Sequence, residues 1–389
     1  MYRIQTMNKI SPVGLNRFDA ALYEVGDEVQ DPQGILVRSA KLLDMEFNPS
    51  LLAIARAGVG VNNIPLDRCA AAGIPVFSTP GANANAVKEL VVCAMLMGSR
   101  DIPGAIRWVR EQAASGVEVA TVVEKGKSAF VGPELYKKTL GIIGLGAIGS
   151  IVANTAISLG MDVYGYDPFL SVDTALRLDR HVHVVKDIND LYKRADYVTL
   201  HIHYTGKTAH MIDADAIAAM KRGVRVINLA RGEIVDDEAI LAALDTGKVA
   251  VYVTDFPNNR LLTAPHVIAM PHLGASTPES EQNCAAMAVD ELTDYLENGN
   301  IRRSVNLPDM VMDRSGVERL CILHKNVPGM LANITSLFGR DGVNVENLSN
   351  KSRGEYAYTM VDLGTKVAER VIEDVQHMAN VIRVRVLEW

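Results

Sequence analysis

The sequence predicts an α/β protein with a doubly wound parallel sheet, followed by a smaller module of strands and helices. Between residues 139 and 271, apolar runs rich in β-branched residues alternate with helical patterns, which is typical of a parallel sheet covered on both faces. From residue 317 onward the order changes to β-α-β-β-α-β. The chain has 389 residues, which is about 2.6 domains at roughly 150 residues per domain, so more than one domain is expected.

The first region, residues 1–84, contains short apolar runs separated by turn residues. Gly34–Arg38 and Leu52–Arg56 are typical of short buried strands, and each ends on an arginine. Gly73–Val76 is interpreted as the start of a strand and Thr79–Gly81 as a turn. Two arginines at strand ends could together bind a phosphate.

The second region supplies the doubly wound sheet. Strands are expected at Thr139–Gly144, Asp162–Tyr166, Tyr197–Ile202, Val224–Leu229, Val249–Thr254 and Val267–Met270. Helices are expected between them, for example at Ala147–Leu159, Asp213–Met220 and Asp237–Thr246.

The third region follows residues 307–316, which break the periodicity and are interpreted as a linker because they contain proline, glycine and aspartate. In residues 317–389, strands are expected at Val317–Leu323, Val343–Leu348, Tyr356–Leu363 and Val381–Leu387. Helices are expected at Gly329–Phe338 and Val367–Met378. This order is that of a ferredoxin-like module.

Composition excludes several classes of protein. Apolar residues make up 48% and charged residues 22%, which are ordinary globular values and exclude a disordered or fibrous chain. The longest apolar run, Leu90–Gly98, is far shorter than the ~20 residues that span a bilayer, and the N-terminus lacks the pattern of a signal peptide. No membrane association is expected.

Charge and cysteine content exclude further classes of protein. A net charge of −7 and an aromatic content of 5% argue against nucleic-acid binding. The four cysteines form no Cys-x-x-Cys pair and are interpreted as buried apolar residues in a reducing compartment, rather than as disulfides or metal ligands. We therefore expect a cytoplasmic protein without a bound metal.

A glycine-rich turn opens the second region. Gly144, Gly146 and Gly149 form a G-x-G-x-x-G pattern between an expected strand and an expected helix. The first glycine permits the tight turn, the second lets a pyrophosphate approach the backbone, and the third packs the helix on the strand. The next strand ends near Asp167, which could accept hydrogen bonds from a ribose diol and would repel a 2′-phosphate. The pattern therefore predicts a site for NAD rather than NADP.

Polar residues follow several expected strands of the same region, namely His201, Arg231, Asp255 and His272. In an open α/β sheet, ligands bind beyond the carboxyl ends of the strands, so these side chains are expected to converge on one crevice. Taken one at a time, His272 would be an ordinary loop histidine and Arg231 a surface arginine.

This set of residues suits hydride transfer. Oxidation of a secondary alcohol needs a base for the hydroxyl proton, and histidine has a suitable acidity. An arginine guanidinium can hold a neighbouring carboxylate with two parallel hydrogen bonds. We therefore expect His272 to act as the base and Arg231 as the carboxylate clamp.

Residues 1–306 resemble the D-2-hydroxyacid dehydrogenase family, and most closely its members that oxidise 3-phospho-D-glycerate. The matching segments include Val37–Ser39, Ala55–Ile64, the glycine-rich turn, Asn228–Gly232 and Pro271–Thr277. The resemblance implies a split, flavodoxin-like substrate-binding domain formed by residues 1–84 and 272–306. It also implies a Rossmann NAD-binding domain at residues 85–271.

The resemblance assigns roles to individual residues. It implies that His272 is the acid/base and Arg231 the carboxylate binder, and it implies substrate contacts from Arg38, Ser39, Arg56, Val59 and Gly60. The expected cofactor-binding residues are Gly144, Gly146, Ala147, Ile148, Gly149, Asp167, His201, Ala230, Arg231, Asp255, His272 and Gly274.

One departure from the family concerns the partner of the histidine. The family pairs its catalytic histidine with a glutamate three residues after a phenylalanine, and here that position is Asn259. The family's aspartate also appears one place late, as Asp255. An amide can bond to an imidazole but cannot stabilise an imidazolium by charge, so we expect either Asn259, Asp255 or another carboxylate to serve His272.

The C-terminal module, residues 317–389, resembles an ACT domain, a small amino-acid-sensing module. In serine-sensitive relatives, similar positions bind L-serine, and here they are His324, Asn326 and Asn344. A strand-to-helix loop offers an exposed helix N-terminus for a carboxylate. The alternative is a structural module that only dimerises through its sheet.

The resemblance therefore implies NAD-dependent oxidation of 3-phospho-D-glycerate to 3-phosphohydroxypyruvate, the first step of L-serine biosynthesis, with feedback by L-serine. It suggests a homodimer or homotetramer. One alternative is a dehydrogenase for another D-2-hydroxy acid, such as glycerate or 2-hydroxyglutarate. The other, motivated by Asn259, is an NAD-binding regulatory protein with weak catalysis.

Overall fold

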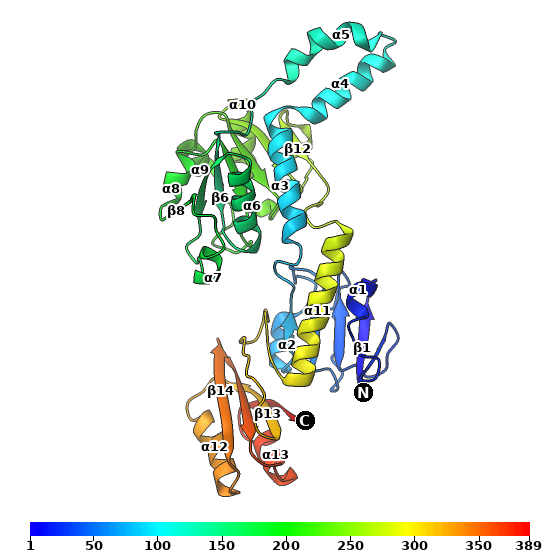
Figure 1. The fold of residues 1–389 in the computed structure, drawn as a ribbon, viewed down its shortest axis with the longest axis vertical. Helices are drawn as coiled ribbons and strands as arrows, with labels where there is room; N and C mark the ends of the chain where they lie inside the picture. Colours follow the sequence, from blue (N-terminus) through cyan, green and yellow to red (C-terminus); the bar gives the residue numbers. More distant parts are fainter. The chain divides into compact units, whose positions relative to one another are not determined.

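A seven-stranded parallel sheet forms the centre of Ala84–Thr277, one of two units into which the chain divides in the computed structural model of residues 1–389 (Figure 1). Its strand order is β12-β11-β10-β9-β6-β7-β8, and every neighbouring pair is parallel. The order reverses between β6 and β9, which makes this pair the switch point where an open α/β sheet binds ligands. The strands are β6 (Thr139–Ile143), β7 (Asp162–Tyr166), β8 (Val182–Val185), β9 (Tyr197–Leu200), β10 (Val224–Asn228), β11 (Val249–Thr254) and β12 (Val267–Ala269).

Helices cover both faces of this sheet, as the sequence predicts for a Rossmann domain. On one face α3 and α6 pack with Leu140, Ile142 and Val163 of the sheet, and on the other α8, α9 and α10 pack with Val198 and Val226. The helices are α3 (Ala84–Ser99), α6 (Ala147–Ser158), α7 (Val172–Ala175), α8 (Ile188–Tyr192), α9 (Ala214–Ala219) and α10 (Asp237–Asp245), with short 3-10 turns η2 (Gly232–Ile234) and η3 (Leu261–Thr263).

All the strands expected in this region are present. Five of them, β6, β7, β10, β11 and β12, agree with the expected ranges within one residue, whereas β9 ends at Leu200 rather than Ile202. The strand β8 and the helix α8 were not expected. None of the four residues of β8 is buried, and α8 has only five residues. Both elements are therefore too short or too exposed to show a clear apolar periodicity.

A helical arm extends from the same unit and contains no buried residue. It consists of α4 (Ile102–Ala114), α5 (Val119–Gly126) and η1 (Lys127–Phe130), and Trp108 packs against Phe130 within it (Figure 1). Ile106 is 50% exposed and Val131 is 78% exposed. None of the helices of the chain is both long enough and apolar enough to span a membrane.

The second unit, Met1–Asn83 with Pro278–Trp389, contains a five-stranded parallel sheet. Its order is β2-β1-β3-β4-β5, the flavodoxin-like order that the sequence predicts. The long helix α11 (Pro278–Asn298) packs on it through Ala288 and Leu292. The other elements are β1 (Tyr2–Met7), α1 (Pro12–Leu15), β2 (Tyr23–Gly26), β3 (Gly34–Val37), β4 (Ala53–Arg56), α2 (Leu66–Ala71) and β5 (Val76–Phe77).

The C-terminal module has the expected β-α-β-β-α-β order. Its four strands form an antiparallel sheet in the order β14-β15-β13-β16, and both helices pack on one face of it through residues such as Phe338 and Val371. The elements are β13 (Glu318–Lys325), α12 (Met330–Arg340), β14 (Val345–Arg353), β15 (Tyr356–Leu363), α13 (Glu369–Gln376) and β16 (Val381–Glu388).

The other face of this small sheet packs on the C-terminal end of α11. Leu323, Met360 and Leu387 belong to the same apolar cluster as Leu292 and Leu296 of that helix. A helix end leaves carbonyl groups without partners inside the helix, and cations are favourable there. Side chains of the module satisfy these carbonyls: Arg385 donates to Tyr295 and Leu296, Arg319 to Asn298, and the Tyr358 hydroxyl to Gly299.

The expected linker, residues 307–316, contains no helix or strand, but it is not loosely attached. Leu307 is fully buried, and Met310 forms a two-hydrogen-bond bridge with Ile301. The module therefore shares a continuous core with the helix that precedes it.

Arg319 of β13 and Asp362 of β15 form an ion pair with no exposed side-chain surface. Arg319 Nε and Nη2 donate to the two Asp362 carboxylate oxygens at 2.5 and 2.7 Å. The remaining donors reach the carbonyl oxygens of Asn298, Met312 and Asp313 at 2.7–3.0 Å. The guanidinium thus joins α11, the segment after it and the small sheet.

Glu291 of α11 carries a stability prediction. The residue is 3% exposed, one carboxyl oxygen has no partner, and burial raises the pKa of the carboxyl group from its ordinary 4.5 to about 8. Folding therefore takes up a proton, so the stability contributed by this group is full below pH 4.5 and is lost as the pH rises toward 8. We expect Glu291→Gln to stabilise the protein at pH 8 by about 1–3 kcal/mol.

Thermal unfolding of both proteins at pH 5 and pH 8 tests this expectation. The variant should unfold at a higher temperature than the wild type at pH 8 and at nearly the same temperature at pH 5. An equal difference at both pH values would show that the ionisation of Glu291 is not the cause.

Candidate active site

The glycine-rich turn connects β6 to α6 at the switch point of the parallel sheet. Gly144 has φ +91°, in the left-handed region that favours glycine. A Cβ on Gly149 would lie 1.9 Å from the carbonyl oxygen of Gly144, so the helix can pack this closely only without a side chain. A Cβ on Gly146 would meet no atom within 4 Å, which leaves open space in front of the helix.

This turn fits a dinucleotide. Helix α6 begins at Ala147 after Gly146, and no side chain caps its first N–H groups, so these donors and the helix dipole can receive a pyrophosphate. Asp167 follows β7 and accepts hydrogen bonds from the N–H groups of Leu145 and Phe169, each at 2.9 Å. The carboxylate is thereby fixed beside the turn, where a ribose diol is expected.

His201 directly follows β9, next to the glycine-rich turn. A Cβ on Gly144 would lie 2.5 Å from the carbonyl oxygen of His201, so the two segments are in close contact. Burial lowers the pKa of His201 to about 3, and its Nε2 lies 3.1 Å from Thr199 Oγ1. The imidazole is therefore neutral at physiological pH, and it can serve a cofactor as a neutral hydrogen-bonding group only.

The turn that carries Arg231 is held by Asn228, the last residue of β10. The side chain of Asn228 is fully buried, donates to the carbonyl oxygen of Arg231 at 2.8 Å and accepts from the N–H of Ala230 at 3.1 Å. The Arg231 guanidinium lies 5.7 Å from the ring centre of Phe256. Asn228 was not predicted as a site residue, although it is part of the matching segment Asn228–Gly232.

Asp255 follows β11 and has no exposed surface. Its Oδ2 accepts from the N–H of Gly274 at 2.9 Å, and its carbonyl oxygen accepts from the N–H of His272 at 2.8 Å. Its Oδ1 has no partner in the protein. Burial raises the pKa of Asp255, whereas the hydrogen bond from Gly274 and the charges of His272 and Arg231 lower it.

His272 is exposed and lies beside these groups. Its backbone has φ +32°, a left-handed conformation that costs a side-chain-bearing residue energy and that recurs at functional sites. Its ring lies 4.7 Å from the ring of Phe256, centre to centre. The segment around His272 is therefore held in an unfavourable conformation by the hydrogen bonds to Asp255.

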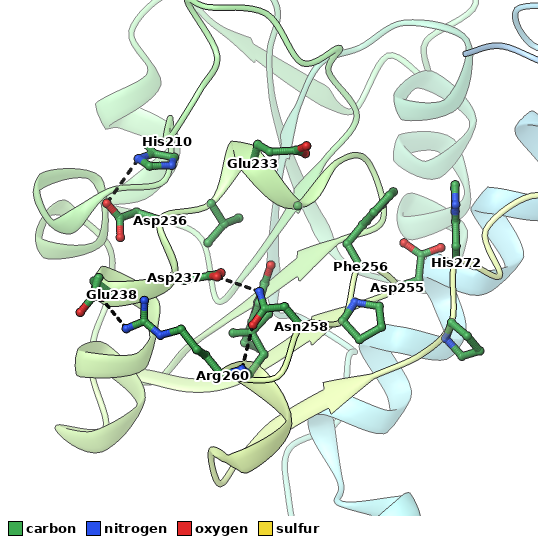
Figure 2. Close-up of a pocket in the computed structure, with 16 residues that line it drawn as sticks. His210, Glu233, Asp236, Asp237, Glu238, Asp255, Phe256, Asn258, Arg260 and His272 are labelled. Carbon is green, nitrogen blue, oxygen red and sulfur yellow. Dashed lines mark hydrogen bonds and ion pairs between the residues drawn. The ribbon is translucent and has the colours of Figure 1, made fainter. Parts of the chain in front are cut away.

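A cavity of about 840 Å³ is lined by His272, Asp255 and Phe256 at one end (Figure 2). At the other end lie three pairs of polar side chains: His210 with Asp236, Arg260 with Glu238, and Asn258 with Asp237.

A role for Asn259 beside His272 stays a prediction. This side chain is exposed and is not among the residues that line the cavity. The reason is local: Asn258 accepts hydrogen bonds from the N–H groups of Arg260 and Leu261, which fixes the turn with Asn258 toward the cavity. Asp255, rather than Asn259, is the group of this segment that bonds to the backbone of His272.

The expected substrate-binding residues lie together in the other unit. Strands β3 and β4 are adjacent and parallel, with Val37 opposite Arg56, so Arg38 and Arg56 emerge at the same sheet edge. Arg56 Nε donates to the carbonyl oxygen of Arg38 at 3.1 Å, and Arg38 Nη2 pairs with Glu281 of α11 at 2.5 Å. Asn8, which the sequence did not reveal, accepts from the N–H of Ser39 and holds that loop.

The loop after β4 offers free N–H groups. Those of Val59 and Gly60 have no acceptor within the protein, so they can bind a carboxylate. Gly58 has φ +151°, and a Cβ there would lie 2.5 Å from Arg56 Nη1. The glycine therefore allows the arginine to fold over the loop.

The expected effector residues are less accessible than the sequence implies. His324 lies within β13 and is 2% exposed, with Nδ1 2.8 Å from the carbonyl oxygen of Lys325 and Nε2 2.8 Å from Thr359 Oγ1. Asn326 donates to the carbonyl oxygen of Gly354 and Asn344 to Glu346. A ligand at His324 would have to replace a hydrogen bond of the protein.

Comparison with known proteins supplies the family. Residues 92–274 match the model of the D-isomer specific 2-hydroxyacid dehydrogenase NAD binding domain, and residues 320–383 match that of the AHAS small subunit-like ACT domain. The D-3-phosphoglycerate dehydrogenase of Haemophilus influenzae is 32% identical over 379 residues, which are 94% of this chain and 88% of that protein. The chain belongs to the D-3-phosphoglycerate dehydrogenase family.

Other members of the D-3-phosphoglycerate dehydrogenase family are longer. That of Methanocaldococcus jannaschii is 35% identical over 302 residues, which are 75% of this chain and 55% of that protein. The chain spans about half the length of several curated relatives that it matches. A solved structure of the family, the NAD+-bound 3-phosphoglycerate dehydrogenase of Entamoeba histolytica, matches with a TM-score of 0.60 and 26% identity, and covers 78% of this chain and 98% of that one.

The family model spans the residues that are expected to bind the cofactor. Its match at residues 92–274 includes the glycine-rich turn, Asp167, Arg231, Asp255 and His272. The chain thus contains the NAD-binding domain of the D-2-hydroxyacid dehydrogenases, as the sequence predicts.

Proposed function

We propose that this protein oxidises 3-phospho-D-glycerate to 3-phosphohydroxypyruvate with NAD, the first step of L-serine biosynthesis. The observation that carries the proposal is the placement of Arg231, Asp255 and His272 at the carboxyl ends of neighbouring strands, in the same domain as a dinucleotide-binding turn. The names of the relatives support the substrate.

The glycine-rich turn and Asp167 would hold NAD, which would supply the acceptor for the hydride of the substrate carbinol carbon. His272 takes the proton of the substrate hydroxyl group, so that the carbonyl can form as the hydride leaves. Arg231 binds the substrate carboxylate and holds the reacting carbon in place. We assign further carboxylate contacts to the N–H groups of Val59 and Gly60 and the phosphate to Arg38 and Arg56.

An assay of NADH formation tests this function. We expect turnover with 3-phospho-D-glycerate and much weaker turnover with D-glycerate and D-2-hydroxyglutarate, which lack the phosphate. Turnover with one of the latter alone would reassign the substrate. NAD binding without turnover of any of the three would favour the regulatory protein over an enzyme.

We further propose that L-serine binds the C-terminal module and inhibits the reaction. The support is the match to an ACT domain and the presence of His324 and Asn326 where β13 ends. Asn344 precedes β14, at the opposite end of the sheet. Titration of the full chain with L-serine, read by calorimetry and by the initial rate, tests this. Equal rates with and without L-serine, together with no heat of binding, would leave the module a purely structural role.

We propose that the chain forms a homodimer through the helical arm formed by α4, α5 and η1. The support is that the arm buries none of its residues although Ile102, Ile106 and Val109 are apolar and exposed. Sedimentation of the wild type and of Ile106→Glu tests this, because a charge in the middle of such an interface should shift the protein toward the monomer.

A further inference from the structure

Arg38 has a counter-ion within the protein. Its Nη2 donates to Glu281 Oε1 at 2.5 Å. Glu281 lies in the first turn of α11, where the positive end of the helix dipole also favours a carboxylate. The side chains of Arg38 and Glu281 are 43% and 44% exposed, so a ligand from solvent can reach both of them. The arginine that we assign to the substrate phosphate is therefore already paired with a negative charge.

This ion pair lies where the phosphate is expected. Arg38 and Arg56 emerge at one edge of the five-stranded sheet, because Val37 at the end of β3 is opposite Arg56 of β4. Arg56 Nε donates to the carbonyl oxygen of Arg38 at 3.1 Å, which connects the two residues directly. The ion pair with Arg38 brings Glu281 of α11 to the same edge of the sheet.

The charges of these three side chains do not match those of a phosphate ester. Two guanidinium groups and one carboxylate leave a single positive charge, whereas a phosphate ester carries about −1.5 to −2 at pH 7. A phosphate that approaches Arg38 also meets the like charge of Glu281, and like charges placed together in a binding site are costly. The phosphate must therefore either replace the carboxylate at Arg38 or bind beside it against their repulsion.

We propose that Glu281 is a specificity-determining residue, because it is the counter-ion that the substrate phosphate displaces from Arg38 and it lowers the affinity of the site for phosphorylated substrates. This inference rests on the proposed function, which assigns the phosphate to Arg38 and Arg56. A substrate without a phosphate leaves the ion pair in place and gains nothing from its removal. Glu281 therefore reduces the preference for 3-phospho-D-glycerate over 2-hydroxy acids that lack a phosphate.

Glu281→Gln in the full chain tests the proposal. The glutamine amide keeps an oxygen that can accept a hydrogen bond from Arg38 and removes only the charge. We expect KM for 3-phospho-D-glycerate to fall about three- to tenfold with kcat nearly unchanged, because the phosphate no longer competes with a carboxylate. The KM of D-glycerate, or its inhibition constant as a competitor, should not change, because D-glycerate has the same carbinol and carboxylate but no phosphate.

Salt provides a second readout. Both side chains of the pair are about half exposed, so mobile ions can screen the charge of Glu281. The ratio of KM between the wild type and Glu281→Gln should be largest at low ionic strength and should shrink toward one at about 1 M KCl, where the screening length is about 3 Å. A ratio that stays the same at both salt concentrations would show that the charge is not the cause, and would overturn the proposal.

Two matched variants on the same helix separate this local charge from the net charge of the protein. Glu279→Gln removes a carboxylate from the same first turn of α11. Asp290→Asn removes a carboxylate from another half-exposed ion pair of α11, that with Arg17. Neither change should lower KM for 3-phospho-D-glycerate as far as Glu281→Gln does. An equal fall in either variant would reject a specific role of Glu281.

Binding of inorganic phosphate separates the proposal from the proposed function, because it requires no turnover. In calorimetric titrations, Glu281→Gln should bind inorganic phosphate more tightly than the wild type does. Tighter binding in a chain that does not turn over 3-phospho-D-glycerate would support the role of Glu281 and reject the proposed function. Turnover of 3-phospho-D-glycerate with an unchanged or higher KM in Glu281→Gln would support the proposed function and overturn the role of Glu281.

Discussion

Replacing His272 with glutamine is expected to lower kcat for 3-phospho-D-glycerate by about 10²–10⁴-fold, the range that a general acid or base contributes. Glutamine can hydrogen-bond the substrate hydroxyl but cannot accept its proton. KM for NAD should stay close to that of the wild type, because the glycine-rich turn and Asp167 are unaffected. Steady-state kinetics of NADH formation measure both quantities.

Controls make the His272 result specific. His181 is an exposed histidine that bonds to Asp179, and His181→Gln removes the same imidazole away from the cavity. Its kcat should match that of the wild type. A His272→Gln variant as fast as the wild type would show that another group handles the proton.

Asn259→Glu addresses the remaining alternative, that of a regulatory protein with weak catalysis. Because Asn259 is exposed and outside the cavity, the introduced glutamate is not expected to raise kcat. A large rise in kcat would instead show that the chain lacks an essential partner for His272 and would favour the regulatory role.

Replacing Asp362 with asparagine is expected to destabilise the C-terminal module by about 3–5 kcal/mol, because it leaves the buried Arg319 charge without its counter-charge. Both side chains are fully buried, and Ser315 also donates to Asp362 through its N–H and its hydroxyl. Denaturant unfolding followed by the fluorescence of Trp389, which lies over the Arg319 guanidinium, measures the loss.

The matched control is the exposed pair of Lys366 and Glu388 in the same module. Glu388→Gln should cost at most about 1 kcal/mol, as is usual for surface ion pairs. The double change Arg319→Met with Asp362→Leu should recover much of the loss, because it leaves no buried charge unpaired. If Asp362→Asn costs no more than Glu388→Gln, the buried pair does not stabilise the module.

Much of the nucleotide-binding domain could be predicted from local sequence patterns. Its strands are continuously apolar and its glycine-rich turn has fixed backbone demands, so each element follows from a few consecutive residues. The convergence of Arg231, Asp255 and His272 could also be predicted, because parallel strands carry their carboxyl ends to one sheet edge.

The supporting residues could not be predicted in the same way. Asn228 and Asn8 act through hydrogen bonds to the backbone of neighbouring loops, and such bonds depend on loop conformation rather than on periodicity. The burial of His324 could not be predicted for a related reason. Its burial follows from the register of β13 against β15, which brings Thr359 to its ring.

The sequence by itself determined that this chain has a doubly wound nucleotide-binding domain and a smaller β-α-β-β-α-β module, and which residues end the strands. These features depend on short-range patterns of apolar residues and glycines. Only the tertiary structure decided that the backbone of Asp255 bonds to that of His272, and that the module is fixed to α11 by buried arginines. Both depend on which groups lose contact with water, because a charge acts strongly only where water is excluded and its partner is held in place.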